Sequence, residues 1–174
     1  MNWTERYKKA HHEWAERTGP GFFKASGGET MKVAYPKVTS SNGLRRAIIN
    51  FMVWSGHHLE ATNNMGRPVA KSYEKFNILS GRLEKISNGI EWQKGSGIRG
   101  SSDAKGHLRH PKHLFAIPIY IEIKYGKDTQ SDEQIEYEAK INATGGIYLI
   151  AKTIDQFFLS YDKLLKQLDN DPTN

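Results

Sequence analysis

The segment from Ile119 to Tyr125 constrains this chain most strongly, because it places two opposite charges inside an apolar run. Its β-branched residues predict a strand, along which successive side chains point to opposite faces. Glu122 and Lys124 therefore share one face. The opposite face carries the apolar side chains, namely Ile119, Ile121, Ile123 and Tyr125.

A carboxylate and a lysine on one strand face suit metal-assisted hydrolysis of a phosphodiester if a neighbouring strand adds a second carboxylate. Two hard oxygen ligands can hold Mg²⁺ or Mn²⁺. The metal lowers the pKa of a bound water and neutralises charge on the phosphate oxygens. The lysine adds a positive group near the nucleophile or the transition state.

The Asp/Glu-x-Lys triplet by itself is weakly specific, since the chain contains three. Glu138-Ala-Lys140 lies in a predicted helix, Asp132 to Ala143, where residues two apart point to different sides. Asp103-Ala-Lys105 lacks apolar flanks, so only Glu122-Ile-Lys124 lies in a β-branched run. A solvent-facing strand with ordinary alternation remains the alternative for this triplet taken alone.

Further motifs accompany that strand in a fixed order from residue 100 onward. They are Gly100-Ser-Ser-Asp103, the Glu122-Ile-Lys124 strand, the polar turn Gly126 to Ser131, the pair Glu133-Gln134, and Gly145-Gly-Ile-Tyr-Leu-Ile150. Together they resemble the PD-(D/E)XK nuclease superfamily, and most closely its VRR-NUC branch and related small phage nucleases, which are similar to Holliday-junction resolvases. The resemblance covers roughly residues 89–160.

The resemblance implies a role for each matching residue. Asp103 and Glu122 would be the metal ligands for Mg²⁺ or Mn²⁺, and the Ile123 carbonyl would complete the coordination. Lys124 would be the catalytic lysine, and Gln134 would support the site or touch the substrate backbone.

The chain departs from this family at its first core helix, where many members supply another glutamate. The corresponding helix here is predicted over Leu44 to Trp54, and no acidic residue lies between Glu29 and Glu60. Glu60, on the next strand, is a weak substitute. The number of metal ions and the catalytic competence therefore stay open.

The implied fold is α/β, a restriction-endonuclease-like core with a central mixed β-sheet flanked by α-helices and an extra N-terminal helix and arm. We expect an N-terminal helix and basic connector arm over residues 1–42, a nuclease-like domain over 43–168 and a polar tail over 169–174. The helix over residues 2–17 is amphipathic, and residues 19–42 read as a connector without clear structure. Residues 69–88 are ambiguous, with short strands on either side of Ser80-Gly81.

Charge is distributed unevenly along the chain. Residues 1–112 hold 19 Lys/Arg against 9 Asp/Glu, whereas residues 113–174 hold 6 against 10. A basic part that precedes an acidic site suits a polyanionic substrate, although a solvated basic surface is an equally ordinary explanation. The residues expected to contact nucleic acid are Arg45, Arg46, Arg99, Lys105 and Arg109.

Three histidines at equal spacing, His107, His110 and His113, raise the question of zinc. Zinc sites need converging ligands with supporting hydrogen bonds, and Pro111 interrupts any helix that would align these three. A hairpin loop beside the active site is the preferred interpretation. The chain has no cysteine, which excludes disulfides and thiol chemistry.

The expected function is a divalent-metal-dependent endonuclease that acts on DNA, with branched DNA and homodimerisation left open. The alternatives are a catalytically inactive nucleic-acid-binding protein on a nuclease fold and a phage assembly protein that docks through its aromatic N-terminal helix. The sequence shows neither a transmembrane run nor the apolar segment of a signal peptide. We therefore expect no membrane partner and a cytoplasmic location, in a bacterium or a phage-infected host cell.

Overall fold

The computed structural model describes residues 2–62, 67–93 and 98–170. The chain divides into two compact units. The first comprises Met1–Thr62 and Gly100–Asn174, and the second is the intervening segment Asn63–Arg99.

A mixed four-stranded sheet forms the centre of the first unit, in the strand order β1-β4-β5-β6. Strand β1 (His58–Ala61) pairs antiparallel with β4 (Ala104–Arg109), which pairs antiparallel with β5 (Ala116–Ile123). Strand β6 (Ile147–Ala151) lies parallel to β5. The expectation of an α/β fold with a mixed sheet is confirmed.

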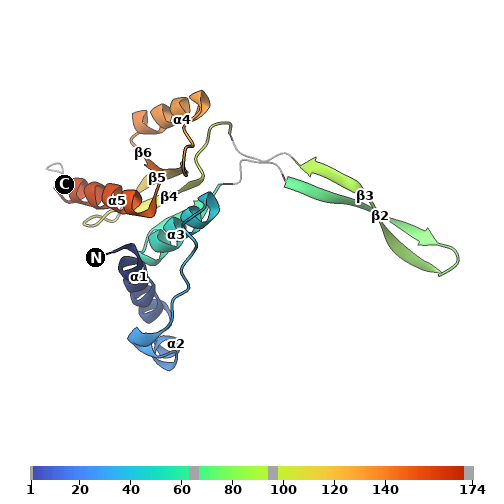
Figure 1. Ribbon diagram of the computed structural model, residues 1–174, viewed down its shortest axis with the longest axis horizontal. Coiled ribbons are helices and arrows are strands. Elements are labelled where there is room, and N and C mark those ends of the chain that lie inside the picture. Colours follow the sequence, from blue (N-terminus) through green and yellow to red (C-terminus); the bar gives the residue numbers. More distant parts are fainter. Residues whose placement is uncertain (1, 63–66, 94–97, 171–174) are drawn as a thin grey trace. The chain divides into compact units, whose positions relative to one another are not determined.

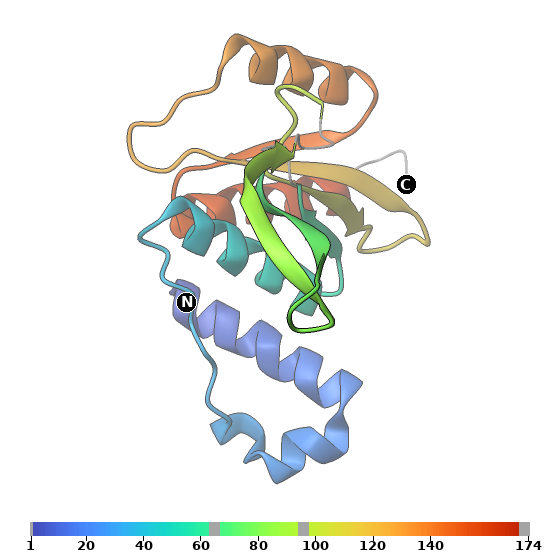
Figure 2. The same ribbon diagram turned by 90° about the vertical axis from the view of Figure 1, so that its right-hand side faces the viewer.

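Helices flank this sheet on both faces (Figures 1 and 2). Helices α3 (Ser41–Trp54) and α5 (Ile154–Asp169) lie on one face, and α4 (Asp132–Ala143) lies on the other. Helix α1 (Trp3–Thr18) packs against α3 and α5, and it is followed by α2 (Pro20–Ala25) and the short 3₁₀ helix η1 (Gly28–Thr30).

The hydrophobic core lies on the α3 and α5 face of the sheet. The alternate β5 residues Ile119, Ile121 and Ile123 point into it, as the strand periodicity predicts. Their partners come from α3, from α5 and from α1, which packs on both of these helices. They include Tyr7, Leu44, Ile48, Met52, Phe157 and Phe158. By contrast, no residue of α4 is buried. This asymmetry leaves the α4 face free to carry polar groups.

The aromatic residues of α1 serve packing. The Tyr7 ring lies 4.7 Å from that of Trp54 and 5.8 Å from that of Tyr35. Arg6 joins α1 to α5 through two contacts with the Asp162 carboxylate, at 2.6 and 2.7 Å. Residues 19–42 are more ordered than expected, because Pro20 begins α2 and Gly27, in the left-handed region, precedes η1.

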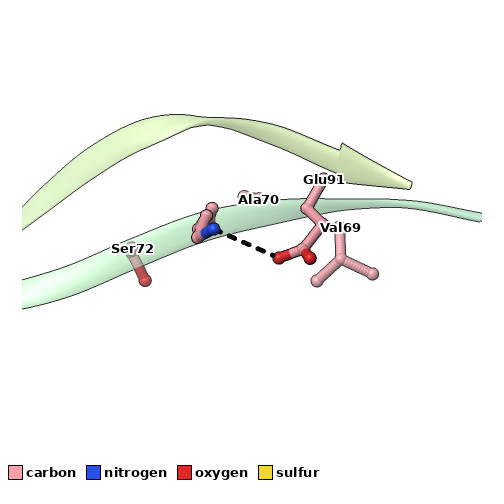
Figure 3. Close-up of a pocket in the computed structure, with 5 residues that line it drawn as sticks. Val69, Ala70, Ser72 and Glu91 are labelled. Atoms are coloured by element: carbon pink, nitrogen blue, oxygen red, sulfur yellow. Dashed lines mark ion pairs between the residues drawn. The ribbon is translucent and has the colours of Figure 1, made fainter. Parts of the chain in front are cut away.

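The second unit contains one antiparallel ribbon, β2 (Arg67–Asn77) and β3 (Arg82–Gln93) (Figure 1). The sequence pattern predicts only short strands here, whereas the structure has two long strands, of 11 and 12 residues. The pairing shifts by one residue between Ala70 and Ser72, opposite Gly89. Gly89 has a φ of +84°, which a β-bulge of this kind requires. Figure 3 shows this region, where Lys71 and Glu91 form an ion pair of 3.7 Å.

The element boundaries agree closely with the sequence patterns elsewhere. The helix over Asp132–Ala143 and the strand over Ile147–Ala151 have the expected ends. Helix α3 begins three residues before the expected Leu44, because the Ser40 hydroxyl caps it by accepting a bond from Gly43. None of the helices in the described part of the chain combines the length and apolarity that a membrane span requires.

Candidate active site

The site centres on a buried carboxylate, Glu122, near the end of β5. Its side chain and that of Lys124 are only 3% and 6% exposed, and Lys124 Nζ lies 3.1 Å from Glu122 Oε1. Gln134, on the first turn of α4, bridges the two. Its amide Nε2 donates to Glu122 Oε1 at 2.5 Å, while its Oε1 accepts from Lys124 Nζ at 2.7 Å. The three side chains thus form a closed, hydrogen-bonded triangle.

Asp103 joins this group from the neighbouring strand. The β4–β5 pairing sets Ala104 opposite Ile121, so the same register places Asp103 opposite Glu122. Asp103 Oδ2 accepts the backbone N–H of Ile123 at 2.9 Å. In an extended strand the N–H and C=O of one residue point to the same edge. The Ile123 carbonyl therefore points toward the side on which Asp103 lies.

Close backbone packing explains the glycine that precedes Asp103. Gly100 has a φ of +76°, and a Cβ at this position would clash with the carbonyl of Glu133 and lie 3.0 Å from the Gln134 nitrogen. Only glycine lets the chain touch the start of α4 this closely. Gly100 therefore serves the contact with the α4 backbone.

A capping box fixes the position of Gln134. The Ser131 hydroxyl accepts the Gln134 N–H, and Gln134 Oε1 accepts the Ser131 N–H at 3.0 Å. A Gln at the third helical position makes this reciprocal bond. The same Oε1 atom also accepts from Lys124. The start of α4 therefore orients the amide that contacts Glu122.

The two carboxylates repel each other. Burial raises the pKa of Glu122 above its ordinary value of 4.5, and the nearby Asp103 raises it further. Hydrogen bonding to Lys124 and its positive charge, together with the Tyr148 hydroxyl, act in the opposite direction. A further cation between Asp103 and Glu122 would relieve this repulsion.

Two residues that contact the site, Tyr148 and Asp128, are not predicted from the sequence. The Tyr148 hydroxyl donates to Glu122 Oε2 at 3.4 Å, and Asp128 Oδ2 lies 3.5 Å from Lys124 Nζ. The parallel register sets Tyr148 beside Tyr120, on the Glu122 face, so alternation along the apolar run could have identified it. Asp128 lies between regular elements, where no periodicity applies.

The carboxylate oxygens fit a hard cation. Among the described residues, Asp103 Oδ1 makes no hydrogen bond or ion pair, and Glu122 Oε2 receives only the long Tyr148 bond. No cluster of three acidic, histidine or cysteine residues with metal-binding geometry occurs in the part of the chain that the structure describes. Mg²⁺ is often bound by one or two carboxylates, with waters and substrate phosphates completing its shell. Asp103, Glu122 and the Ile123 carbonyl therefore suit Mg²⁺ or Mn²⁺.

The basic residues that are expected to contact nucleic acid do not all lie in one place. Arg45 and Arg46 line an open pocket on α3 together with Ala61, the last residue of β1. Lys105 is exposed two residues after Asp103 and lies 3.9 Å from Glu60. Arg99 is exposed immediately before Gly100. Arg99 and Lys105 are thus close to Asp103 in sequence, and Arg45 and Arg46 share a pocket with Ala61, which pairs with Ala104.

Arg109 and the histidine-rich turn lie elsewhere. Strand β4 carries Arg109 about 20 Å from Asp103, since each strand residue advances the chain by about 3.3 Å. The turn after Arg109 is a hairpin, as expected, but the expectation that it lies beside the active site is wrong. His110 Nδ1 accepts the N–H groups of Lys112 and His113 at 3.1 and 3.2 Å. Its proton is then on Nε2, which cannot bind zinc in that form.

His57 has a structural role near Arg109. Its Nδ1 accepts the Arg109 backbone N–H at 3.1 Å, so its Nε2 donates to the Tyr161 hydroxyl at 2.7 Å. Burial, aided by the charge of Arg109, lowers its pKa to about 4. The adjacent His58 is exposed. One histidine of the pair thus packs inward and the other is solvated.

Comparison of the chain with known protein families, with curated proteins and with solved structures finds no match.

Proposed function

We propose that this chain is a divalent-metal-dependent endonuclease that hydrolyses DNA phosphodiester bonds on a restriction-endonuclease-like core. The observation that carries the proposal is the meeting of Asp103, Glu122 and Lys124 from adjacent segments. Glu122 and Lys124 pair through their side chains, and the Asp103 carboxylate accepts the N–H of Ile123 between them. The order of elements supports it, because the Asp103 segment, the Glu122 strand, the Gln134 helix and the Tyr148 strand follow one another as the family resemblance implies.

The residues of the chain supply distinct parts of this chemistry. Asp103 and Glu122, with the Ile123 carbonyl, would hold the ion. When bound, Mg²⁺ would supply an acidified water and neutralise charge on the scissile phosphate. Lys124, held by Glu122 and Gln134, places an ammonium where it can orient the attacking water and stabilise negative charge on the phosphorane-like transition state. Cleavage would leave a 5′-phosphate, as the resemblance implies.

A polyanionic substrate agrees with the distribution of charge. The exposed cations Arg99 and Lys105 are close to Asp103 in sequence, and the exposed Arg46 shares a pocket with Ala61. The basic excess of the chain is confined to residues 1–112. Such residues contact phosphates without reading base sequence. DNA is therefore the proposed substrate, with branched DNA as one of the structures to compare.

The test is cleavage of end-labelled linear, flapped and four-way-junction DNA by the purified chain, in Mg²⁺, Mn²⁺ or EDTA. Cuts that require the metal and disappear in Glu122→Gln support the proposal, and the preferred structure defines the substrate class. Intact DNA in every metal, from protein that is folded and binds DNA, refutes it.

A second candidate is a non-catalytic DNA-binding protein on the same fold. It is favoured because no third acidic or histidine side chain among the described residues lies where it could share a metal ion with Asp103 and Glu122. It is also favoured by the complete internal pairing of Glu122 Oε1 with Lys124 and Gln134. Metal binding separates the two. Mg²⁺ should raise the thermal unfolding temperature of the wild type and leave Asp103→Asn unchanged if the site is a metal site.

A further inference from the structure

The ribbon of β2 and β3 displays apolar side chains that no part of its own unit covers. Ile78 and Leu79 at its tip are 87% and 99% exposed, and Phe76 and Leu83 in the last strand pair before Asn77 are 56% and 65% exposed. An isolated two-stranded hairpin has marginal stability in water. The exposed apolar tip therefore favours a role in binding a partner.

The tip loop is ordered by its own polar groups. The Asn77 side-chain oxygen accepts the N–H groups of Leu79 and Ser80 at 2.9 and 3.3 Å, and the Gly81 N–H donates to the Asn77 carbonyl at 2.8 Å. Glu84 Oε1 accepts from both Asn77 Nδ2 and the Ser80 hydroxyl. Turns of this size usually carry polar residues or glycine. Here the polar residues hold the loop, and the two most exposed positions are apolar.

The size of the tip argues against a protein partner. The four tip side chains bury no more than a few hundred Å², whereas a specific protein interface buries roughly 800 Å² on each partner. The other exposed apolar residues of the ribbon, Val69, Tyr73 and Ile90, lie away from the tip. A wedge between base pairs needs only one or two apolar side chains, and proteins that bend DNA commonly use Leu or Ile in this way. A two-stranded ribbon also fits a DNA groove.

Charge near the tip agrees with a nucleic-acid partner. Arg82 pairs with Asn77 in the last rung of the ribbon, and Lys75 lies two rungs away from it, opposite Glu84. Lys71 and Lys85 continue the cations toward the base of the ribbon, where Lys71 pairs with Glu91 and Lys85 lies opposite Glu74. The two strands together hold five Lys/Arg against three Glu, so the ribbon keeps a basic excess. These side chains could contact the phosphates on either side of an inserted wedge.

In sequence, the ribbon segment follows β1 and precedes β4 of the first unit. Strand β2 has 11 residues and spans about 37 Å, which is about one turn of duplex DNA. The ribbon is therefore long enough to lie along one turn of a duplex.

We propose that Ile78 and Leu79 form a wedge that inserts between base pairs of duplex DNA while the ribbon cations contact the flanking phosphates. This inference rests on the proposed function, because that function supplies DNA as the partner. It adds a contact with the duplex that the catalytic residues do not make, and a means of distorting the duplex.

The test uses the full chain carrying Glu122→Gln, in Mg²⁺, and duplexes of about four helical turns with 2-aminopurine at successive positions. We expect fluorescence to rise several-fold at one position, where the bases unstack. Adding Ile78→Ser and Leu79→Ser should abolish this rise and weaken binding roughly tenfold, the effect of losing a stacking contact. Leu159→Ser, at an equally apolar residue of α5 that is 72% exposed, is the matched control and should keep the rise.

Two results would overturn the inference. One is the same fluorescence and affinity with and without the tip substitutions, and the other is a wild-type oligomer that the tip substitutions convert to monomer, which would assign the tip to a second copy. Cleavage by the wild type is measured in parallel. If DNA is cut but the tip variant matches its parent, only the wedge fails; if the wild type neither binds nor cuts DNA, the proposed function and the wedge fail together.

Discussion

The Asp103 carboxylate accepts the backbone N–H of Ile123, and this bond of 2.9 Å joins the start of β4 to the strand that carries Glu122 and Lys124. The proposed metal ligand Asp103 is thereby held in place by the strand that carries Glu122. The carboxylate uses one oxygen for position, and its other oxygen makes no bond within the described residues. Because one oxygen positions the side chain and the other is open to a cation, substitutions at Asp103 should change stability and cleavage separately.

Asp103→Asn should keep the fold and lose the chemistry. The asparagine oxygen can still accept the Ile123 N–H, so the free energy of unfolding should change by less than about 1 kcal/mol. The loss of the charged ligand should lower cleavage by roughly 100-fold or more. Asp103→Ala should lose about 1–2 kcal/mol of stability in addition. Urea denaturation and single-turnover cleavage measure the two effects, and wild-type cleavage by Asp103→Asn would contradict them.

Gly100→Ala should destabilise the chain more than a comparable glycine substitution. Both Gly100 and Gly126 have positive φ angles, +76° and +67°, but only Gly100 lacks space for a Cβ. Gly126→Ala should cost about 1 kcal/mol for its backbone conformation. Gly100→Ala should cost roughly 2 kcal/mol more, because the clash with Glu133 displaces the start of α4. Equal losses in thermal denaturation would show that the contact with α4 is unimportant.

The pH dependence of cleavage should report the ionisation of Glu122. Its pKa is raised in the folded chain, so its carboxylate form costs stability as pH rises through that pKa, and bound Mg²⁺ should offset this cost. The acid limb of the single-turnover rate should have its midpoint above 4.5. Tyr148→Phe removes a hydrogen bond that lowers the pKa, so the midpoint should move to higher pH. A midpoint that is unchanged or lower in Tyr148→Phe would contradict this role of the hydroxyl.

His57 should make the fold sensitive to acid. Its pKa of about 4 lies below its ordinary value of 6.5, so the stability it contributes is complete above pH 6.5 and is lost as pH falls toward 4. The loss should be on the order of 2 kcal/mol, after allowance for solvent screening. His57→Gln should remove this part of the pH dependence, measured by urea denaturation at both ends of the window. His58→Gln, at the exposed neighbour, should retain it.

Much of the fold follows from periodicity in the sequence. The alternation of Ile119, Ile121 and Ile123 predicts the buried face of β5, and the Ser131–Gln134 capping box marks the start of α4. The pairing of Glu122 with Lys124 on the other face also follows from alternation. These features depend on neighbours in sequence, which a single chain displays directly.

The remaining features depend on contacts between distant residues. The shift at Gly89 lets β2 and β3 pair over their full length, and nothing local in the mixed polar and apolar run reveals it. The position of Arg109 is equally hidden in the sequence. The length of β4 decides how far Arg109 lies from Asp103, and the positive charge of Arg109 says nothing about that distance. Tyr148 reaches Glu122 only through the parallel β5–β6 register.

The most direct measurement is the single-turnover cleavage of the preferred DNA by wild type, Glu122→Gln and Glu136→Gln in Mg²⁺. Glu136 lies on the exposed side of α4, where it pairs with Lys140, and it controls for the loss of one negative charge. We expect wild type and Glu136→Gln to cut at similar rates, and Glu122→Gln to cut at least about 100-fold more slowly while remaining folded. Metal-dependent cleavage by Glu122→Gln at the wild-type rate would contradict a catalytic site built on Glu122.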